Sequence, residues 1–169
     1  MAKKNGRGIF YSKEGNKYEG YWENDRRILD NYIENKEYIK EIIFLEHTKV
    51  KIEYVDGDKY EGDYNPSTKT IEGLGTYFFN HDEIYKGEFK DNVFSGKGEL
   101  FYNGNKTSGN FKDGKLNGYG EIEMKDGNNL KGDFKVGKKE GVFSYYDKSL
   151  NKSVKHIYEN DIFVEELDE

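Results

Sequence analysis

A five-residue motif recurs along this chain and limits its fold more than any other feature. In its best copies tyrosine is first, glycine third and an aromatic residue fifth. Four copies begin 25, 22 and 23 residues apart: Tyr60-Glu61-Gly62-Asp63-Tyr64, Tyr85-Lys86-Gly87-Glu88-Phe89, Thr107-Ser108-Gly109-Asn110-Phe111 and Leu130-Lys131-Gly132-Asp133-Phe134. Because side chains alternate between the two faces of a strand, the motif predicts a strand with rings and glycine on one face and charges on the other.

A second motif, Gly-x-Gly, alternates with the first. Its copies are Gly6-Arg7-Gly8, Gly73-Leu74-Gly75, Gly96-Lys97-Gly98 and Gly118-Tyr119-Gly120. Weaker copies of the first motif lie at 18–22, 38–42 and 153–157. Two strand motifs that alternate at a fixed period predict a repeat protein of stacked β-hairpins.

Turn residues fill the gaps between the motifs. Asn-Gly and Asp-Gly pairs are favoured where both central turn residues need positive φ. They or a similar pair occur at Asp56-Gly57, Asn103-Gly104, Asp113-Gly114, Asp126-Gly127 and Val136-Gly137. Residues 33–45 have some helical periodicity, but their register with the repeats favours a pair of strands there.

These motifs resemble the MORN repeat, strongly over 60–146, weakly over 18–32 and poorly over 38–59 and after 147. The resemblance implies an all-β fold, a single-layer, elongated antiparallel β-meander of stacked MORN hairpins, twisted into a trough. We expect one domain over 1–169. Its units are a half-unit at 5–17, repeats at 18–37, 38–59 (degenerate), 60–84, 85–106, 107–129 and 130–152, a degenerate end unit at 153–164 and an acidic tail at 165–169.

Composition narrows the class of protein. The chain of 169 residues is 36% charged and 34% hydrophobic, and it has no cysteine for disulfides or thiolate metal sites. No apolar run approaches the roughly 18 residues that a membrane helix needs. The first residues include no apolar segment after their lysines, so we expect no secretory signal. We therefore expect an intracellular, cytoplasmic protein, and the resemblance extends this to the cytoskeleton, the axoneme or the membrane periphery.

Nothing in the sequence predicts catalysis. His47, His81 and His156 have no companion residues at the spacing of a zinc site or an activated nucleophile. The segment Gly96-Lys97-Gly98 is followed by a predicted strand, whereas a nucleotide-binding glycine loop needs a helix there. The carboxylates follow the repeat, as residues of a polar outer face would. We expect no enzyme activity, no metal and no cofactor.

The aromatic face is the predicted binding surface. Contiguous exposed apolar surface commonly marks an interaction site, and a helix or an extended peptide laid in the trough is the expected ligand. The alternative is that the trough closes on itself and its rings are satisfied by neighbours and glycine. We expect both to hold: the strand-start tyrosines pack, and the outer ring edges are available. The predicted binding residues are Trp22, Tyr64, Phe89, Phe111, Phe134, Tyr18, Tyr60 and Tyr85. The expected function is a non-catalytic scaffold or adaptor, and the resemblance implies a subunit of a larger cytoskeletal, ciliary or membrane-associated assembly.

A lysine stripe offers a second interpretation. Stacked repeats would align Lys90, Lys112, Lys115, Lys135, Lys138 and Lys139 along one edge, parallel to an acidic stripe of Glu41, Asp63, Glu88 and Asp133. Alternating charges of this kind solvate a flat sheet and block edge pairing. The resemblance also permits a phosphoinositide or acidic-lipid site at these lysines. The net charge of −6 argues against strong adsorption to anionic lipid, and we expect no nucleic acid partner.

Two further hypotheses concern partners. The terminal half-units leave open strand edges, so we hypothesise a homodimer formed by end-to-end pairing of two chains. The Lys-, Asn- and Ile-rich composition also suits an AT-rich genome, which leaves open a bacterial repeat protein with an immunity or antitoxin-like role.

Overall fold

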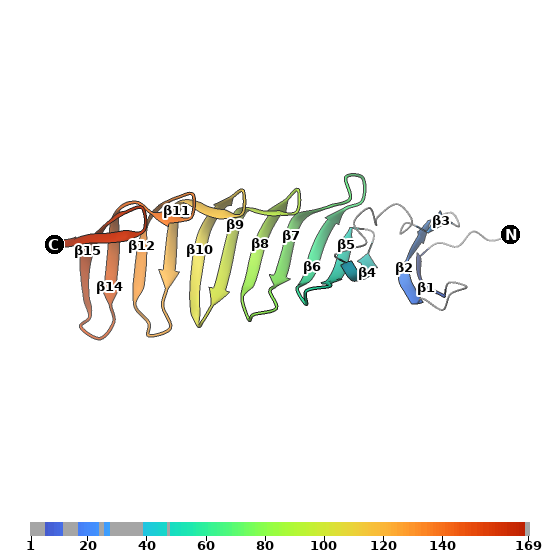
Figure 1. The fold of residues 1–169 in the computed structure, drawn as a ribbon, viewed down its shortest axis with the longest axis horizontal. Helices are drawn as coiled ribbons and strands as arrows, with labels where there is room; N and C mark the ends of the chain where they lie inside the picture. Colours follow the sequence, from blue (N-terminus) through green and yellow to red (C-terminus); the bar gives the residue numbers. More distant parts are fainter. Residues whose placement is uncertain (1–5, 12–16, 24–25, 28–38, 47, 168–169) are drawn as a thin grey trace.

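The computed structural model describes residues 6–11, 17–23, 26–27, 39–46 and 48–167. No described residue is helical, so none belongs to a helix long and apolar enough to cross a bilayer. The described residues form antiparallel strands in two sheets, and the larger sheet has 13 strands in meander order (Figure 1). The predicted all-β meander is confirmed.

The strands follow the chain closely. The small sheet contains β1 (Gly6–Tyr11), β2 (Lys17–Glu23) and β3 (Arg26–Arg27). The large sheet contains β4 (Ile39–Glu46), β5 (Lys49–Tyr54), β6 (Lys59–Asn65), β7 (Thr70–Phe78), β8 (Ile84–Lys90), β9 (Val93–Tyr102), β10 (Asn105–Lys112), β11 (Lys115–Glu123), β12 (Asn129–Lys135), β13 (Lys138–Lys139), β14 (Gly141–Asp147), β15 (Lys152–Glu159) and β16 (Ile162–Leu167). Each of the units predicted at 60–84, 85–106, 107–129 and 130–152 therefore contains one hairpin.

Three local outcomes concern units near the two ends of the large sheet. Of the segment 33–45, where we favoured strands over a helix, residues 39–45 belong to strand β4 (Ile39–Glu46), which pairs with β5, and residues 33–38 lie outside the described residues. The strand after β12 is broken at Glu140, which separates β13 from β14. Strand β16 continues through Glu165 and Glu166, two residues that we expected in an acidic tail.

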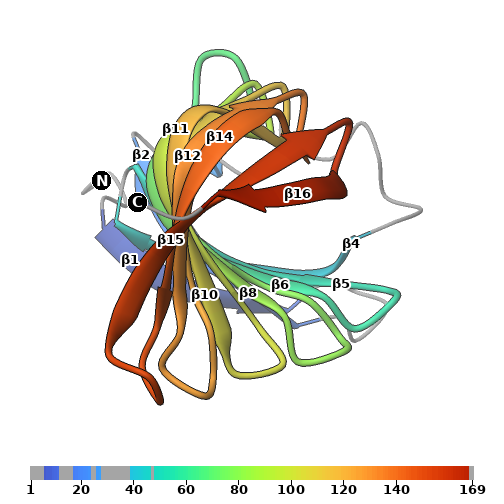
Figure 2. The same ribbon diagram turned by 90° about the vertical axis from the view of Figure 1, so that its left-hand side faces the viewer.

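The large sheet is one curved layer. Figure 1 shows the strands side by side along the long axis, and Figure 2 shows that the layer bends into a C-shaped cross-section. The pairing of β6–β7, β8–β9 and β10–β11 shifts register after Gly62, Gly87 and Gly109 respectively, and such bulges bend the strands that carry them.

A single curved layer can bury side chains only on the side toward which it curves. We call this the inner face, and the opposite side the outer face. The hydrophobic core is a continuous cluster on the inner face: Phe44, Val50, Ile52, Tyr60, Tyr64, Ile71, Tyr85, Phe89, Phe111, Leu116, Leu130, Phe134, Phe143 and Tyr158.

The predicted positive-φ pairs are confirmed at three turns. Both residues have positive φ in Asn103-Gly104, Asp113-Gly114 and Val136-Gly137. The prediction is wrong for Asp56-Gly57 and Asp126-Gly127, where only the glycine does. These loops are longer: in the first, Gly57 N donates to the Tyr54 carbonyl at 3.1 Å and Tyr54 N donates to the Asp58 carbonyl at 2.9 Å.

Hairpin turns also dock onto the preceding hairpin. In each case a turn N–H donates to a strand carbonyl one unit earlier: Asn92 to Ile71 at 3.1 Å, Gly114 to Phe94 at 3.0 Å, Gly137 to Leu116 at 2.8 Å and Asp161 to Lys139 at 2.9 Å. The same hydrogen bond therefore recurs from one hairpin to the next. Backbone hydrogen bonds at the turns hold neighbouring hairpins together, in addition to the side-chain contacts.

Candidate functional site

A row of glycines crosses the middle of the sheet. The strand register places these residues directly opposite one another on successive strands from β6 to β12: Gly62, Gly75, Gly87, Gly98, Gly109, Gly120 and Gly132. Glycine has no side chain to occupy the surface above it. The row therefore leaves a bare strip of backbone that rings from the inner face can cover.

Tyrosines cover the first two glycine pairs of this row. A Cβ added to Gly75 would lie 2.6 Å from Cζ of Tyr60, and a Cβ added to Gly98 would lie 2.6 Å from Cε2 of Tyr85. Each hydroxyl then donates to a carbonyl, Tyr60 to Asp63 at 2.7 Å and Tyr85 to Glu88 at 3.0 Å. Each tyrosine side chain thus lies along its own strand and reaches the carbonyl of the residue three positions later.

Burial also changes the acidity of these phenols. Desolvation, with a smaller contribution from the Glu88 charge, raises the pKa of Tyr85 to about 12. Desolvation likewise raises the pKa of Tyr60. Both hydroxyls are therefore neutral hydrogen-bond donors at neutral pH and are unsuited to act as bases.

The predicted aromatic binding residues are largely buried. The exposed fractions are 1% for Tyr60, 6% for Tyr64, 0% for Tyr85, 5% for Phe89, 6% for Phe111 and 7% for Phe134. Tyr18 and Trp22 lie in β2, and their side chains are outside the described part of the chain. Tyr60 and Tyr85 pack, as we expected of the strand-start tyrosines, but the ring edges that we expected to remain available are covered in all six described rings.

These rings are satisfied by one another. The ring centroids of Tyr60 and Phe89 are 5.1 Å apart, and those of Tyr85 and Phe111 are 5.0 Å apart, both in edge-to-face arrangements. Phe94 stacks flat on Tyr85, with the centroids 3.8 Å apart. Such pairs each stabilise the fold by about 0.5–1.5 kcal/mol beyond area burial. The residues first predicted to bind a partner therefore form the core.

A half-buried apolar row remains on the inner face beside this core. It consists of the second-strand neighbours of the motif residues, Tyr77, Leu100, Ile122 and Tyr145. Each pairs across the ladder with the first residue of a motif, Tyr77 with Tyr60, for example. We call these four residues the rim row. A shallow hollow of about 600 Å³ next to it is lined by Asn105, Ile122, Met124, Lys125 and Asp126.

The acidic residue of the motif has a structural role that the sequence analysis missed. Glu88 Oε1 accepts the Lys97 N–H at 2.9 Å, and Asp63 Oδ2 accepts the Leu74 N–H at 2.9 Å. The glycines just before these donors have φ of +64° at Gly96 and +98° at Gly73. The carboxylates therefore cap the bulges. The signal in the sequence was an acid after the motif glycine followed by Gly-x-Gly on the next strand.

The predicted lysine stripe lies beside the hairpin turns. Lys90, Lys112, Lys115, Lys135 and Lys138 are exposed, and no described carboxylate lies within 4.0 Å of their ammonium groups. Lys139 differs, because its Nζ lies 3.4 Å from Asp161 and 4.5 Å from the centre of the Tyr158 ring. Five of the six lysines thus have free charges.

The histidines do not form a site. His47 is outside the described residues. His81 bonds Glu83 at 3.0 Å, whereas His156 stacks on Tyr145 and bonds Glu166 at 3.1 Å. Among the described residues, no group of three or more His, Cys, Asp or Glu side chains is arranged to hold a metal ion.

Comparison with models of known protein families finds no match for this chain, and comparison with curated proteins finds none either.

Proposed function

We propose that this protein is a non-catalytic scaffold or adaptor that binds a helical or extended segment of another protein along its inner face. The observation that carries the proposal is the rim row, whose partly buried apolar side chains recur on every second paired strand from β7 to β14. The expected trough is retained, but its contact residues move from the buried first strands to Tyr77, Leu100, Ile122 and Tyr145.

The spacing of the rim row suits such a segment. Successive members come from strands two apart, so they are separated by about 9.6 Å along the sheet. Seven residues of an α-helix rise by about 10.5 Å, so one apolar residue per two turns would meet one rim residue per hairpin. A partner that spans several hairpins would gain one contact from each.

The test uses cross-linking from defined positions. A photoreactive phenylalanine analogue at Ile122 faces the inner side, and the same analogue at Thr76 on β7 faces the outer side. We expect one protein from a native extract to cross-link at 122 and not at 76, at low and at high salt. Leu100→Ser/Ile122→Ser should abolish its binding, and Leu74→Ser, which alters an outer-face side chain that is 63% exposed, should not. Equal cross-linking from both faces would contradict the proposal.

The MORN assignment is part of this proposal. One hairpin per 22–25 residues, with the motif glycines in register across the sheet, supports repeats of this type. Membership of a cytoskeletal, ciliary or membrane-associated assembly rests on the resemblance alone, and the protein identified by cross-linking would test it.

The lysine stripe supports a second candidate function, a peripheral membrane module that binds acidic headgroups. Its supporting observation is the set of five exposed lysines with no described carboxylate within 4.0 Å. Phosphoinositide vesicles should then sediment with the chain at low salt, release it at high salt, and fail to bind Lys90→Glu/Lys112→Glu/Lys135→Glu. Binding that ignores salt or these three lysines would contradict this candidate.

The proposed homodimer concerns the edge of the large sheet. Strand β16 pairs only with β15 among the described strands, and its side chains are exposed, with Ile162 at 69% and Phe163 at 50%. Unpaired strand edges of this kind accept further strands. Sedimentation at high micromolar concentration should show a dimer that Val164→Pro disrupts. A strictly monomeric mass would contradict the proposal.

A further inference from the structure

We propose that the outer face of β7 to β9 is a second docking surface, which takes an acidic amphipathic helix of a partner protein. It is built from Phe78, Ile84 and Phe101, which we call the outer strip. Phe78 pairs with Ile84 and Ile84 with Phe101, so the three side chains are direct neighbours on successive strands. This surface lies on the opposite side of the sheet from the rim row.

The outer strip is apolar, unlike its neighbours in the row of outer-face residues that pair across successive strands. The residues that flank the strip in this row are charged: the row continues as Lys59 and Glu53 on one side and as Lys106 and Glu123 on the other. Phe78 is 38% exposed, and Ile84 and Phe101 are partly exposed. The sheet's core does not need these three residues, because their neighbours Tyr77, Tyr85 and Leu100 point inward to it.

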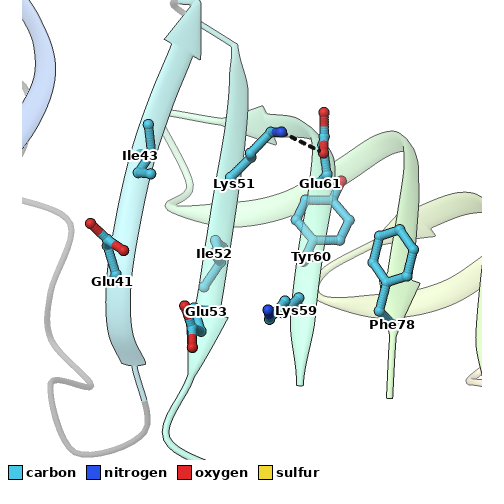
Figure 3. Close-up of a pocket in the computed structure, with 9 residues that line it drawn as sticks. All are labelled: Glu41, Ile43, Lys51, Ile52, Glu53, Lys59, Tyr60, Glu61 and Phe78. Carbon is cyan, nitrogen blue, oxygen red and sulfur yellow. Dashed lines mark ion pairs between the residues drawn. The ribbon is translucent and has the colours of Figure 1, made fainter. Parts of the chain in front are cut away.

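A hollow of 290 Å³ opens next to Phe78. Figure 3 shows the Phe78 ring at one side of this pocket, with Lys59 beside it and the ion pair of Lys51 and Glu61 above. The pocket gives the end of the strip a concave site that an apolar side chain of a partner can enter.

The charged side chains around the outer strip indicate what kind of partner it would bind. The carboxylates that border the strip are already paired: Glu53 with Lys40 at 2.7 Å, Glu61 with Lys51 at 2.9 Å, and Glu123 and Glu99 with Lys106 at 2.6 and 3.7 Å. Lys59 and Lys86 are exposed and have no described carboxylate within 4.0 Å, and Lys86 Nζ lies 5.4 Å from the centre of the Phe101 ring. Glu41 lines the side of the hollow away from Phe78, and no described cation lies within 4.0 Å of its carboxylate. The unpaired charges next to the strip itself are those of Lys59 and Lys86, which favours an acidic ligand.

The geometry suits a helix. Phe78 and Phe101 are two strands apart, about 9.6 Å, which is close to the rise of about 10.5 Å over seven helical residues. A helix laid across the strands would place apolar residues at i, i+3 or i+4, and i+7 on the outer strip. Acidic residues beside that stripe would reach Lys59 and Lys86.

The experiment uses two designed helical peptides as probes. Both have leucine at i, i+4 and i+7, and the other positions are rich in glutamate in one peptide and in lysine in the other. Fluorescence anisotropy with the full chain should show the acidic peptide binding at least about tenfold more tightly than the basic one. Phe78→Ser/Phe101→Ser should weaken acidic-peptide binding by at least about tenfold, because it removes the apolar anchors.

Charge reversal and a matched control complete the test. Lys59→Glu/Lys86→Glu changes only exposed side chains and should reverse the preference between the two peptides. Tyr119→Ser removes an outer-face ring that is 61% exposed elsewhere on the sheet, and it should leave binding unchanged. Circular dichroism should show every variant folded.

Several results would overturn the proposal. Equal affinity for the two peptides would remove the acidic selectivity, and equal loss in Tyr119→Ser would show nonspecific adsorption. Self-association that Phe78→Ser/Phe101→Ser abolishes would mean that a second copy of the chain occupies the strip. Binding of phosphatidylserine vesicles through Lys59 and Lys86, without peptide binding, would assign the face to a membrane.

Discussion

The glycine row is covered in the hairpins of β6–β9 and in those of β10–β14, but different residues cover it in the two regions. In the first region Tyr60 and Tyr85 cover the glycine pairs, and Asp63 and Glu88 cap the bulges. In the second region the motif begins with threonine and leucine. There Leu116 lies within 2.9 Å of a Cβ added at Gly120, and the Phe143 ring lies over Gly132.

The bulge caps differ in the same way. Asn110 and Asp133 stand where Asp63 and Glu88 stand in the first region, but among the described residues nothing lies within 4 Å of a Cβ added to Gly118 or Gly141. The comparison shows which parts of the motif are essential. The glycine row must be covered, but an aliphatic side chain or a ring from the neighbouring strand can cover it, and the acidic cap is dispensable.

The largest difference in stability is expected between substitutions at two glycines from different copies of the Gly-x-Gly motif. In Gly98→Ala the new Cβ meets the buried Tyr85 ring, and overpacking of this kind costs about 3 kcal/mol of unfolding free energy. In Gly118→Ala the space is open and only the φ of +87° opposes the change, at a cost of about 1 kcal/mol. Urea unfolding measures both, and equal losses would refute the covering role of Tyr85.

Leu116 should be almost as important as a tyrosine. Leu116→Ala uncovers Gly109 and Gly120 and should lower the unfolding free energy by about 2–4 kcal/mol. Leu74→Ala is the matched control, because Leu74 is 63% exposed, and it should change stability by less than about 0.5 kcal/mol. A loss below about 1 kcal/mol at Leu116 would mean that the second region does not need its cover.

The bulge caps offer a smaller contrast. Glu88→Ala removes the acceptor of the Lys97 N–H and should cost about 1 kcal/mol. Asn110→Ala changes the corresponding position, where no cap exists, and should have almost no effect. Thermal unfolding at neutral pH compares the two, and the interpretation fails where Asn110→Ala costs as much as Glu88→Ala.

The smallest expected effect is the loss of stability at alkaline pH that comes from the Tyr85 hydroxyl of the first region. An unfolded tyrosine ionises near pH 10, whereas the pKa of folded Tyr85 is raised to about 12. The stability that Tyr85 contributes is therefore complete below pH 10 and declines as the pH rises toward 12. Tyr85→Phe should be slightly less stable at pH 8 and should lose less stability than the wild type between pH 9 and 11.5. Parallel pH profiles would contradict this assignment.

The strands, their order and their two faces could be predicted from the sequence because alternation and glycine-based turns are local properties. The exposure of the rings could not, because a period of two shows which residues share a face but not how far the sheet curves over it. Phe89 and Phe111 became core residues through that curvature. The Glu88 cap was also hidden, since its partner Lys97 lies on the next strand across a bulge. The outer strip could not be predicted, because Phe78, Ile84 and Phe101 lie outside both repeated motifs.

Nuclear Overhauser measurements on the isotope-labelled chain test most directly whether aromatic rings cover the glycine row. We expect cross-peaks between the Tyr85 ring protons and the Hα protons of Gly87 and Gly98, together with upfield shifts of those Hα signals caused by the ring current. Gly118 should show neither effect, because no atom of the described residues lies within 4 Å of a Cβ added there. Hα signals of Gly98 at unshifted positions, without cross-peaks to Tyr85, would mean that the Tyr85 ring does not cover Gly98.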